Sequence, residues 1–342
     1  MGPGLRRDGP AIVADRMTSG APQYDFLTLG ETLIRLSPQG MLRLDQARAF
    51  EVGVGGSELN VACLLARLGR RATWVSRLPL GPLGRVVDGE GRRHGVDMDH
   101  VKWVDARQGL MFFEAGPAPR NARVIYDRKN SAAAGMTIDD VDWPALIAAS
   151  RHVHLSGITP ALSESCKVVA LEVAAVAGRV GVPLSYDLNY RATLTTAGEA
   201  QAVLAAIAPQ LELFLLAERD AQQVLGFAES GERLAQAVAA RYGVPLVALT
   251  RPPGADTGDI FLARGTVRYA PRYPVEIVDR IGAGDSFLAG LIHGLLDGDL
   301  DRAIRLAAYA AAIGLATPGD INYFGSEDLA AFDADMTGRL VR

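Results

Sequence analysis

The stretch VDRIGAGDSF, residues 278–287, carries the strongest structural signal in this chain of 342 residues. Apolar residues follow it at helical spacing until Asp297-Gly298 ends the run; they are Leu288, Leu291, Ile292 and Leu295. The small residues of the stretch therefore predict the entry to a helix. Backbone N–H groups at such an entry have no partner within the helix and lie at the positive end of its dipole, so we expect them to bind an anion, and a phosphate fits well.

Asp285 falls in the first turn of this predicted helix. A carboxylate there would lie beside the bound phosphate, where it can accept a proton from an attacking hydroxyl group. An acidic residue at a helix N-terminus also stabilises its own helix without any catalytic role, and an isolated Gly-Ala-Gly-Asp more often has that simpler meaning. The rest of the sequence decides between the two interpretations.

A second glycine cluster, Gly53-Val54-Gly55-Gly56-Ser57, opens the first long helix and is followed by Asn60. Glycines at such a point let a polar ligand approach the backbone, and an asparagine side chain can both donate and accept hydrogen bonds. Taken alone, the cluster is more typical of a tight turn at a helix start. Together with residues 278–287, it favours a ligand site built by two distant segments.

Between these clusters, short β-like runs alternate with helical ones, which predicts a mostly parallel sheet covered by helices on both faces. The strands are expected at Phe26–Leu29, Thr73–Ser76, His152–Leu155, Leu184–Asp187, Leu213–Leu216 and Leu246–Leu249. The helices are expected at Ser57–Leu68, Leu83–His94, Ser163–Arg179, Glu199–Ile207 and Glu232–Tyr242. Right-handed crossovers would then bring the strand ends, and any ligand, to one edge of the sheet.

Two segments interrupt this alternation, at about residues 32–54 and 108–127. They contain short β-like pieces with no helix between them: Leu33–Leu36, Leu110–Glu114 and Ala122–Tyr126. We expect these pieces to pair into a small separate sheet that serves as a lid or as half of a dimer interface. Residues 23–342 would then form one domain with this lid, and residues 1–22 a disordered N-terminal extension rich in Arg, Gly and Pro.

The composition excludes several classes of protein. The formal net charge is −4 and no basic stripe stands out, which argues against nucleic-acid or anionic-membrane partners. Cys63 and Cys166 are too few for a disulfide framework and have no metal-ligand partners nearby, so a cytoplasmic location is expected. A P-loop is absent, because none of the lysines, at 102, 129 and 167, follows a glycine.

The two glycine clusters resemble the signature segments of the ribokinase/PfkB carbohydrate kinases, over about residues 25–324. The resemblance implies a three-layer α/β/α core with a small β-lid, and transfer of the γ-phosphoryl group of ATP, with Mg²⁺, to a sugar hydroxyl. It implies Asp285 as the catalytic base and the N–H groups of Gly282, Ala283 and Gly284 as the anion hole. It also implies sugar contacts by Gly55, Gly56 and Asn60.

Three further segments resemble the 2-keto-3-deoxygluconate kinases of this family: Tyr126-Asp127-Arg128, Asp187-Leu188-Asn189-Tyr190-Arg191 and Thr317-Pro318-Gly319-Asp320. The resemblance implies that Tyr126, Arg128 and Arg191 bind the carboxylate and the sugar, and that Asp320 binds a hydroxyl. Two arginines at one pocket also favour an acidic sugar, because a guanidinium holds a carboxylate through two hydrogen bonds. The Asp-x-Asn-x-Arg motif occurs in fructokinases as well, so fructose or another neutral sugar is the alternative.

The nucleotide side is less well marked. We expect nucleotide contacts from Thr250, Gly254 and Tyr309, and a weak Mg²⁺ contact from Asp220, which stands where the family commonly has glutamate. Arg280 replaces the family's usual threonine. These departures leave open a sugar- or nucleotide-binding sensor that has lost catalysis. Because an exposed sheet edge invites pairing, we also expect a homodimer through the lid.

Overall fold

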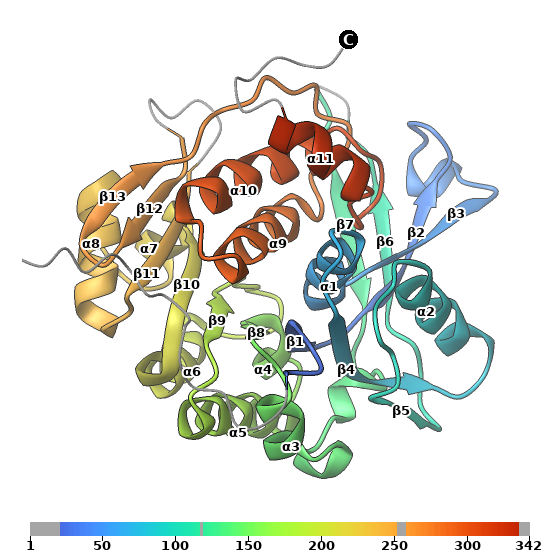
Figure 1. Cartoon of the computed structure of the whole chain (residues 1–342). Helices are drawn as coiled ribbons and strands as arrows, with labels where there is room; N and C mark the ends of the chain where they lie inside the picture. Colours follow the sequence, from blue (N-terminus) through green and yellow to red (C-terminus); the bar gives the residue numbers. More distant parts are fainter. Residues whose placement is uncertain (1–20, 117–118, 252–257, 335–342) are drawn as a thin grey trace, which may run out of the picture.

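The computed structural model describes residues 21–116, 119–251 and 258–334. Most of the predicted N-terminal extension, residues 1–22, and Gly254 lie outside these ranges. The described residues form one nine-stranded sheet and a separate four-stranded sheet (Figure 1).

The nine-stranded sheet has the order β13-β12-β11-β10-β9-β8-β1-β4-β5. All neighbours from β5 to β11 pair in parallel, and β12 and β13 continue the sheet as an antiparallel hairpin. The predicted mostly parallel sheet is thus confirmed. Its strands are β1 (Phe26–Leu29), β4 (Ala72–Pro79), β5 (Val101–Val104), β8 (Val153–Ser156), β9 (Leu184–Asp187), β10 (Leu211–Ala217), β11 (Leu246–Thr250), β12 (Ile260–Ala263) and β13 (Thr266–Tyr269).

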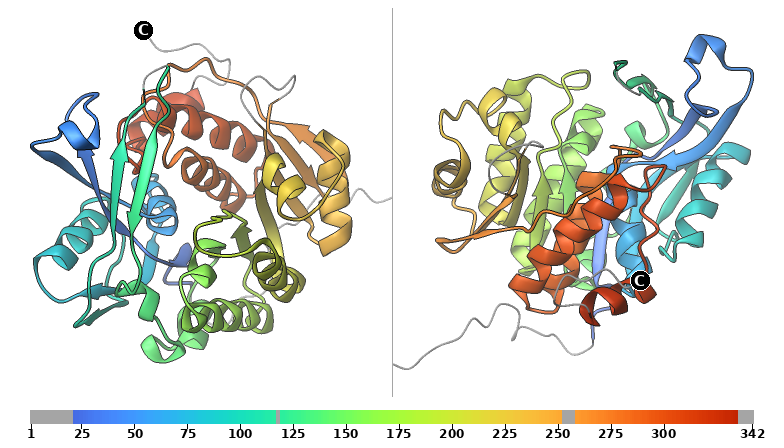
Figure 2. Two further views of the ribbon diagram at one scale, coloured as in Figure 1. Left: turned by 180° about the vertical axis from the view of Figure 1, so that it is seen from behind. Right: turned by 90° about the horizontal axis from the view of Figure 1, so that it is seen from above.

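Helices cover both faces of this sheet, as Figure 2 shows from behind and from above. Successive strand residues alternate between two apolar cores: Phe26 faces one core and Leu27 the other. The first core includes α1 (Ser57–Arg67), α2 (Pro82–Arg93), α9 (Ala283–Leu296) and α10 (Leu300–Leu315). The second includes α3 (Trp143–Ala148), α5 (Glu164–Val180), α6 (Ala197–Ile207), α7 (Glu218–Gln223) and α8 (Gly231–Tyr242).

The short helices α4 (Ile158–Ala161) and α11 (Ser326–Ala334) complete the α-helices of the described chain. None of the helices in that part combines the length and the apolarity needed to cross a bilayer.

The four-stranded sheet corresponds to the predicted lid. Its order is β3-β2-β6-β7, with β2 and β6 parallel and the other pairs antiparallel. The strands are β2 (Leu33–Pro38), β3 (Phe50–Gly55), β6 (Leu110–Glu114) and β7 (Arg123–Asp127). Because β2 follows β1 after three residues and β3 leads directly into α1, the lid lies beside the edge of the main sheet at which the parallel strands end (Figure 1).

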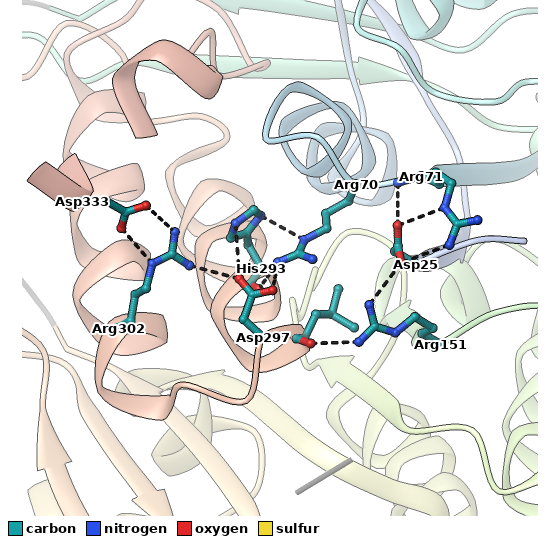
Figure 3. Close-up of polar contacts among 9 residues, drawn as sticks. Asp25, Arg70, Arg71, Arg151, His293, Asp297, Arg302 and Asp333 are labelled. Atoms are coloured by element: carbon teal, nitrogen blue, oxygen red, sulfur yellow. Dashed lines mark hydrogen bonds and ion pairs between the residues drawn. The ribbon is translucent and has the colours of Figure 1, made fainter. Parts of the chain in front are cut away.

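Polar contacts hold the opposite edge of the core together (Figure 3). Asp25, just before β1, accepts hydrogen bonds from the backbone N–H and the Nε of Arg71, just before β4, at 3.0 and 3.3 Å. Arg70, after α1, forms an ion pair of 2.6 Å with Asp297 and donates to Nδ1 of His293 near the end of α9. Burial lowers the pKa of His293 to about 4, so its neutral ring accepts this bond. The network fixes the C-terminal end of α9, whose N-terminus faces the lid.

Candidate active site

A pocket of about 300 Å³ lies between the lid and the edge of the main sheet at which the parallel strands end. It is the edge at which open α/β sheets bind their ligands. Most of the residues predicted for substrate and phosphate binding line it: Gly55, Gly56, Asn60, Tyr126, Arg128, Arg191, Gly282, Gly284, Asp285 and Asp320. The structure therefore brings together segments that are more than two hundred residues apart in the sequence.

The N-terminus of α9 forms one wall of the pocket. Gly282 is the N-cap of the helix with φ = 80°, a left-handed conformation that favours glycine. A Cβ atom at this position would overlap the backbone carbonyl of Asp320, so the close packing also requires glycine. Ala283 begins the helix and Gly284 follows in its first turn. The first helical hydrogen bond runs from the N–H of Ser286 to the carbonyl of Gly282. The N–H groups that precede Ser286 therefore have no partner within the helix and suit an anion.

Asp285 lies in that first turn and is held by two donors from α1. The Ser57 hydroxyl donates to its Oδ1 at 2.6 Å, and the Asn60 amide donates to its Oδ2 at 2.7 Å. Asn189, after β9, donates in turn to the Ser57 hydroxyl at 3.0 Å. Burial raises the pKa of Asp285, while the two hydrogen bonds and the nearby charge of Arg191 oppose that shift. A carboxylate that is fixed in direction and has a raised pKa is suited to accept a proton.

The glycines of the second cluster have a packing role that the sequence alone did not reveal. A Cβ atom on Gly55 would overlap the carboxylate of Asp320, and one on Gly56 would overlap the carbonyl oxygen of Glu31. These glycines thus let the end of β3 approach Asp320 and the segment after β1. Asn60, predicted to contact the sugar, hydrogen-bonds to Asp285.

The two predicted arginines of the pocket differ in their partners. Arg128 donates through Nε to Glu31 at 2.6 Å, and its guanidinium carbon lies 5.4 Å from the centre of the Tyr126 ring. Arg191, by contrast, has no side-chain hydrogen bond or ion pair with any described residue. Arg280, which also lines the pocket, has none within the described ranges either. The pocket therefore presents two guanidinium groups whose hydrogen-bonding capacity is unused.

Carboxylates gather beside Asp285. Asp187, at the end of β9, has its pKa raised to about 7, chiefly by burial and also by the negative charges of Asp285 and Asp220. Asp220, in the first turn of α7, is held at 2.8 Å by Arg219. No group of three or more metal-ligating side chains is found among the described residues. The mutual repulsion of these carboxylates still favours a cation that keeps most of its waters, which is how Mg²⁺ usually binds beside nucleotide phosphates.

Of the residues predicted for the nucleotide, Thr250 and Tyr309 do not line this pocket. Thr250 ends β11, and Gly254 falls outside the described residues. The Tyr309 ring on α10 packs against three aromatic rings, Tyr273, Phe324 and Phe332, with centroid distances of 5.1 to 5.6 Å. This packing by itself gives Tyr309 a structural role, and its contact with adenine stays a prediction.

Several site residues were not singled out from the sequence. Glu31 and Arg35 are buried beside the pocket, although both are charged. Arg35 stands between the apolar residues Ile34 and Leu36 in β2, and such an interruption of a buried strand is the signal that could have identified it. Ser57 carried no signal of its own, because its partner Asp285 is 228 residues away.

Comparison with known proteins agrees with this geometry. The family model described as pfkB family carbohydrate kinase matches residues 25–325. The chain is 36% identical over 299 residues to a 2-dehydro-3-deoxygalactonokinase of Haloferax volcanii, covering 87% of this chain and 92% of the relative. It is 28% identical over 320 residues to a 2-dehydro-3-deoxygluconokinase of Bacillus subtilis, covering 91% and 95%.

A solved structure extends the similarity to three dimensions. The crystal structure of 2-dehydro-3-deoxygluconokinase from Thermotoga maritima superposes with a TM-score of 0.84 at 34% sequence identity. The match covers 90% of this chain and 99% of that one. Both the main sheet and the lid are therefore within the range of the similarity.

Proposed function

Because the chain belongs to the pfkB family of carbohydrate kinases, we propose that it phosphorylates a 2-keto-3-deoxy sugar acid at the expense of ATP. The favoured acceptor is 2-keto-3-deoxygluconate, which would become its 6-phosphate, and the galactonate epimer is the nearest relative of that acceptor. The observation that carries the proposal is Arg191, which has no partner among the described side chains and lines the same pocket as Asp285. The names of the relatives from Haloferax volcanii, Bacillus subtilis and Thermotoga maritima support it.

The reaction follows from the groups that line the pocket. Asp285 accepts the proton of the sugar hydroxyl as that oxygen attacks the γ-phosphorus, and the bond to the β-phosphate oxygen breaks to release ADP. The N–H groups of Gly282, Ala283 and Gly284 stabilise the negative charge on the transferred phosphoryl oxygens. Arg191 binds the sugar carboxylate, and Arg128 and Tyr126 line the same pocket. With its carboxylate held there, the sugar acid can present another of its hydroxyl groups to Asp285.

A bound Mg²⁺ would supply positive charge that neutralises part of the phosphate charge of the nucleotide. Asp187 and Asp220 are the carboxylates that would suit it, through intervening water, because the charges of Asp220 and Asp285 both act on Asp187. Asp285 keeps the hydrogen bonds that Ser57 and Asn60 donate to it and acts as the base, not as a metal ligand.

Replacement of Arg191 by methionine tests the sugar assignment. We expect kcat/KM for the sugar acid to fall by about 10- to 100-fold, the value of a lost charge-assisted hydrogen bond to a carboxylate, and most of the loss to appear in KM. Turnover of fructose, which has no carboxylate, should change little. Arg179→Met on the outer surface of α5 is the control. Equal losses for both sugars would contradict the assignment of Arg191 to the carboxylate.

The alternatives are separated by initial rates of ADP release with 2-keto-3-deoxygluconate, 2-keto-3-deoxygalactonate and fructose. A preference for either acid supports the proposal, and the two acids decide which epimer is used. A preference for fructose would make the protein a neutral-sugar kinase that retains Asp285 as base. Binding of sugar and nucleotide with no turnover would favour the inactive sensor.

We also propose that the protein is a homodimer formed through the lid. The lid strands expose large apolar side chains, with Val52 62% exposed and Phe50, Ile125 and Tyr126 each near 40%. A small sheet with such a surface tends to pair with a second copy. Sedimentation at micromolar concentration is expected to give a dimer, and Val52→Asp a monomer, whereas Val168→Asp on α5 should leave the dimer intact. A wild-type monomer would contradict the proposal.

A further inference from the structure

Arg35 is the most deeply buried charged group of the lid. It lies in β2, it is 6% exposed, and its guanidinium is 4.0 Å from the centre of the Phe113 ring on β6. Two carboxylates from outside the lid hold it: Asp279, through an ion pair of 2.6 Å, and Asp320, through a shorter contact. Because the two carboxylates lie 244 and 285 residues away in the sequence, the cluster joins three separate segments of the chain.

Each carboxylate of this cluster also fixes part of the pocket wall. Oδ1 of Asp279 accepts the N–H of Ile281 at 3.1 Å, and its Oδ2 accepts the N–H of Gly319 at 3.3 Å. Asp279 thus shapes the loop that leads into α9 and its anion-binding N-terminus. The carboxylate of Asp320 lies against Gly55, and the carbonyl of the same residue lies against Gly282.

We propose that Arg35 is a positioning residue of the kinase, which holds the anion-binding loop and the sugar-facing carboxylate of Asp320 in register with each other and with the lid. The inference rests on the function proposed above. It assigns to Arg35 no contact with either substrate, since its guanidinium is enclosed by Asp279, Asp320 and Phe113.

The hydrogen bonding of Asp320 shows why its position matters. Its Oδ1 is bound to Arg35, whereas its Oδ2 has no hydrogen-bond partner in the described part of the chain. Since Asp320 lines the pocket, this second oxygen is available to a hydroxyl group of the sugar. Arg35 therefore fixes the direction of a carboxylate that can bind the acceptor. Through its ion pair with Asp279, Arg35 also fixes the loop that leads into the anion-binding N-terminus of α9.

Arg35 also sets the charge state of Asp320. The pKa of Asp320 is raised to about 6, chiefly by burial and also by the charges of Asp279 and of Asp285 on α9, whereas Arg35 on β2 opposes the shift. An ionised Asp320 is present above this pKa and is lost as the pH falls through it. Without the guanidinium, the same carboxyl group should take up its proton at a higher pH.

The test compares Arg35→Lys and Arg35→Met with the wild type at several pH values. We expect KM for the sugar acid to rise by about 10- to 100-fold, because small displacements of a substrate-binding group have effects of that size, and KM for ATP to change less. In Arg35→Met the acidic limb of kcat/KM should move to higher pH, and Arg35→Lys, which keeps one positive charge, should partly restore it.

Arg77→Lys is the control, because Arg77 is another arginine with little exposure, held by Asp140 at 2.6 Å outside the pocket. It should lower the melting temperature without changing KM or the pH profile. Asp279→Asn keeps the Arg35–Asp320 pair and should lower kcat more than it raises the KM of the sugar. If Arg35→Met does not fold, Arg35→Lys and Asp279→Asn still decide the question.

Two failures are distinguishable in the same series. No turnover of any sugar by the wild type would count against the proposed function. In that case the Arg35 variants would be compared with the wild type by calorimetric binding of the sugar acid in the presence of a non-hydrolysable ATP analogue. A folded Arg35→Lys variant with wild-type sugar affinity and an unshifted pH profile would overturn the role of Arg35, whatever the activity of the wild type.

Discussion

Asp285→Asn is expected to lower kcat by about 10²- to 10⁴-fold, the usual contribution of a positioned general base. Asparagine has nearly the same shape, so Ser57 and Asn60 keep a neighbour of the same size, but it cannot accept the proton of the sugar hydroxyl. Because the hydroxyl is activated only in the transition state, KM for both substrates should change little. Stopped-time assays of ADP formation with the sugar acid measure the loss.

The control for this variant is Asp301→Asn, which changes an exposed aspartate on α10 that pairs with Arg268 far from the pocket. It should retain wild-type kinetics. Calorimetric binding of nucleotide to Asp285→Asn separates a catalytic loss from a folding defect. A variant that binds both substrates and turns over at the wild-type rate would exclude Asp285 as the base.

Gly282→Ala is the second change with a large expected effect. A left-handed conformation costs a non-glycine residue about 1–2 kcal/mol, and here the new methyl group would also overlap the carbonyl of Asp320. The chain must move at the point where the first N–H groups of α9 face the phosphate. We expect a loss of stability together with a loss of kcat of about 10²-fold or more, comparable to the removal of one donor from an anion hole.

Gly298→Ala separates the two causes. Gly298 follows the other end of α9 with φ = 77°, and a Cβ atom there meets nothing within 4 Å. This variant should show the conformational cost of about 1–2 kcal/mol in chemical denaturation and keep its activity. Equal losses of stability in the two variants, with activity retained in both, would contradict the crowding at Gly282.

The regular parts of the fold follow from local sequence signals. The strand Leu184–Asp187 and the helix that begins after Gly282 were predicted at or near their observed bounds, because apolar periodicity and glycines mark such elements locally. The hairpin of β12 and β13 was not predicted. Its strands have four residues each and carry a weak pattern; β12 is stabilised by pairing with β11, and β13 by pairing with β12.

The site was less accessible to sequence reasoning, since its contacts join distant segments. The phosphate-binding entry of α9 could be recognised because its signal lies within one continuous stretch. The partners of Asp285 and Arg35 could not, because each contact spans more than 220 residues. The glycines 55 and 56 were interpreted as room for a ligand, whereas the structure shows that they also make room for Asp320 and Glu31.

Phosphorus NMR of a reaction with 2-keto-3-deoxygluconate, ATP and Mg²⁺ tests the proposed transfer without a coupling enzyme. We expect a new phosphomonoester signal on the primary hydroxyl of the sugar acid, formed in equal amount to ADP, and no such signal with Asp285→Asn. Growth of inorganic phosphate alone, or unchanged ATP with both sugar acids while fructose is phosphorylated, would contradict the assignment of a sugar-acid kinase.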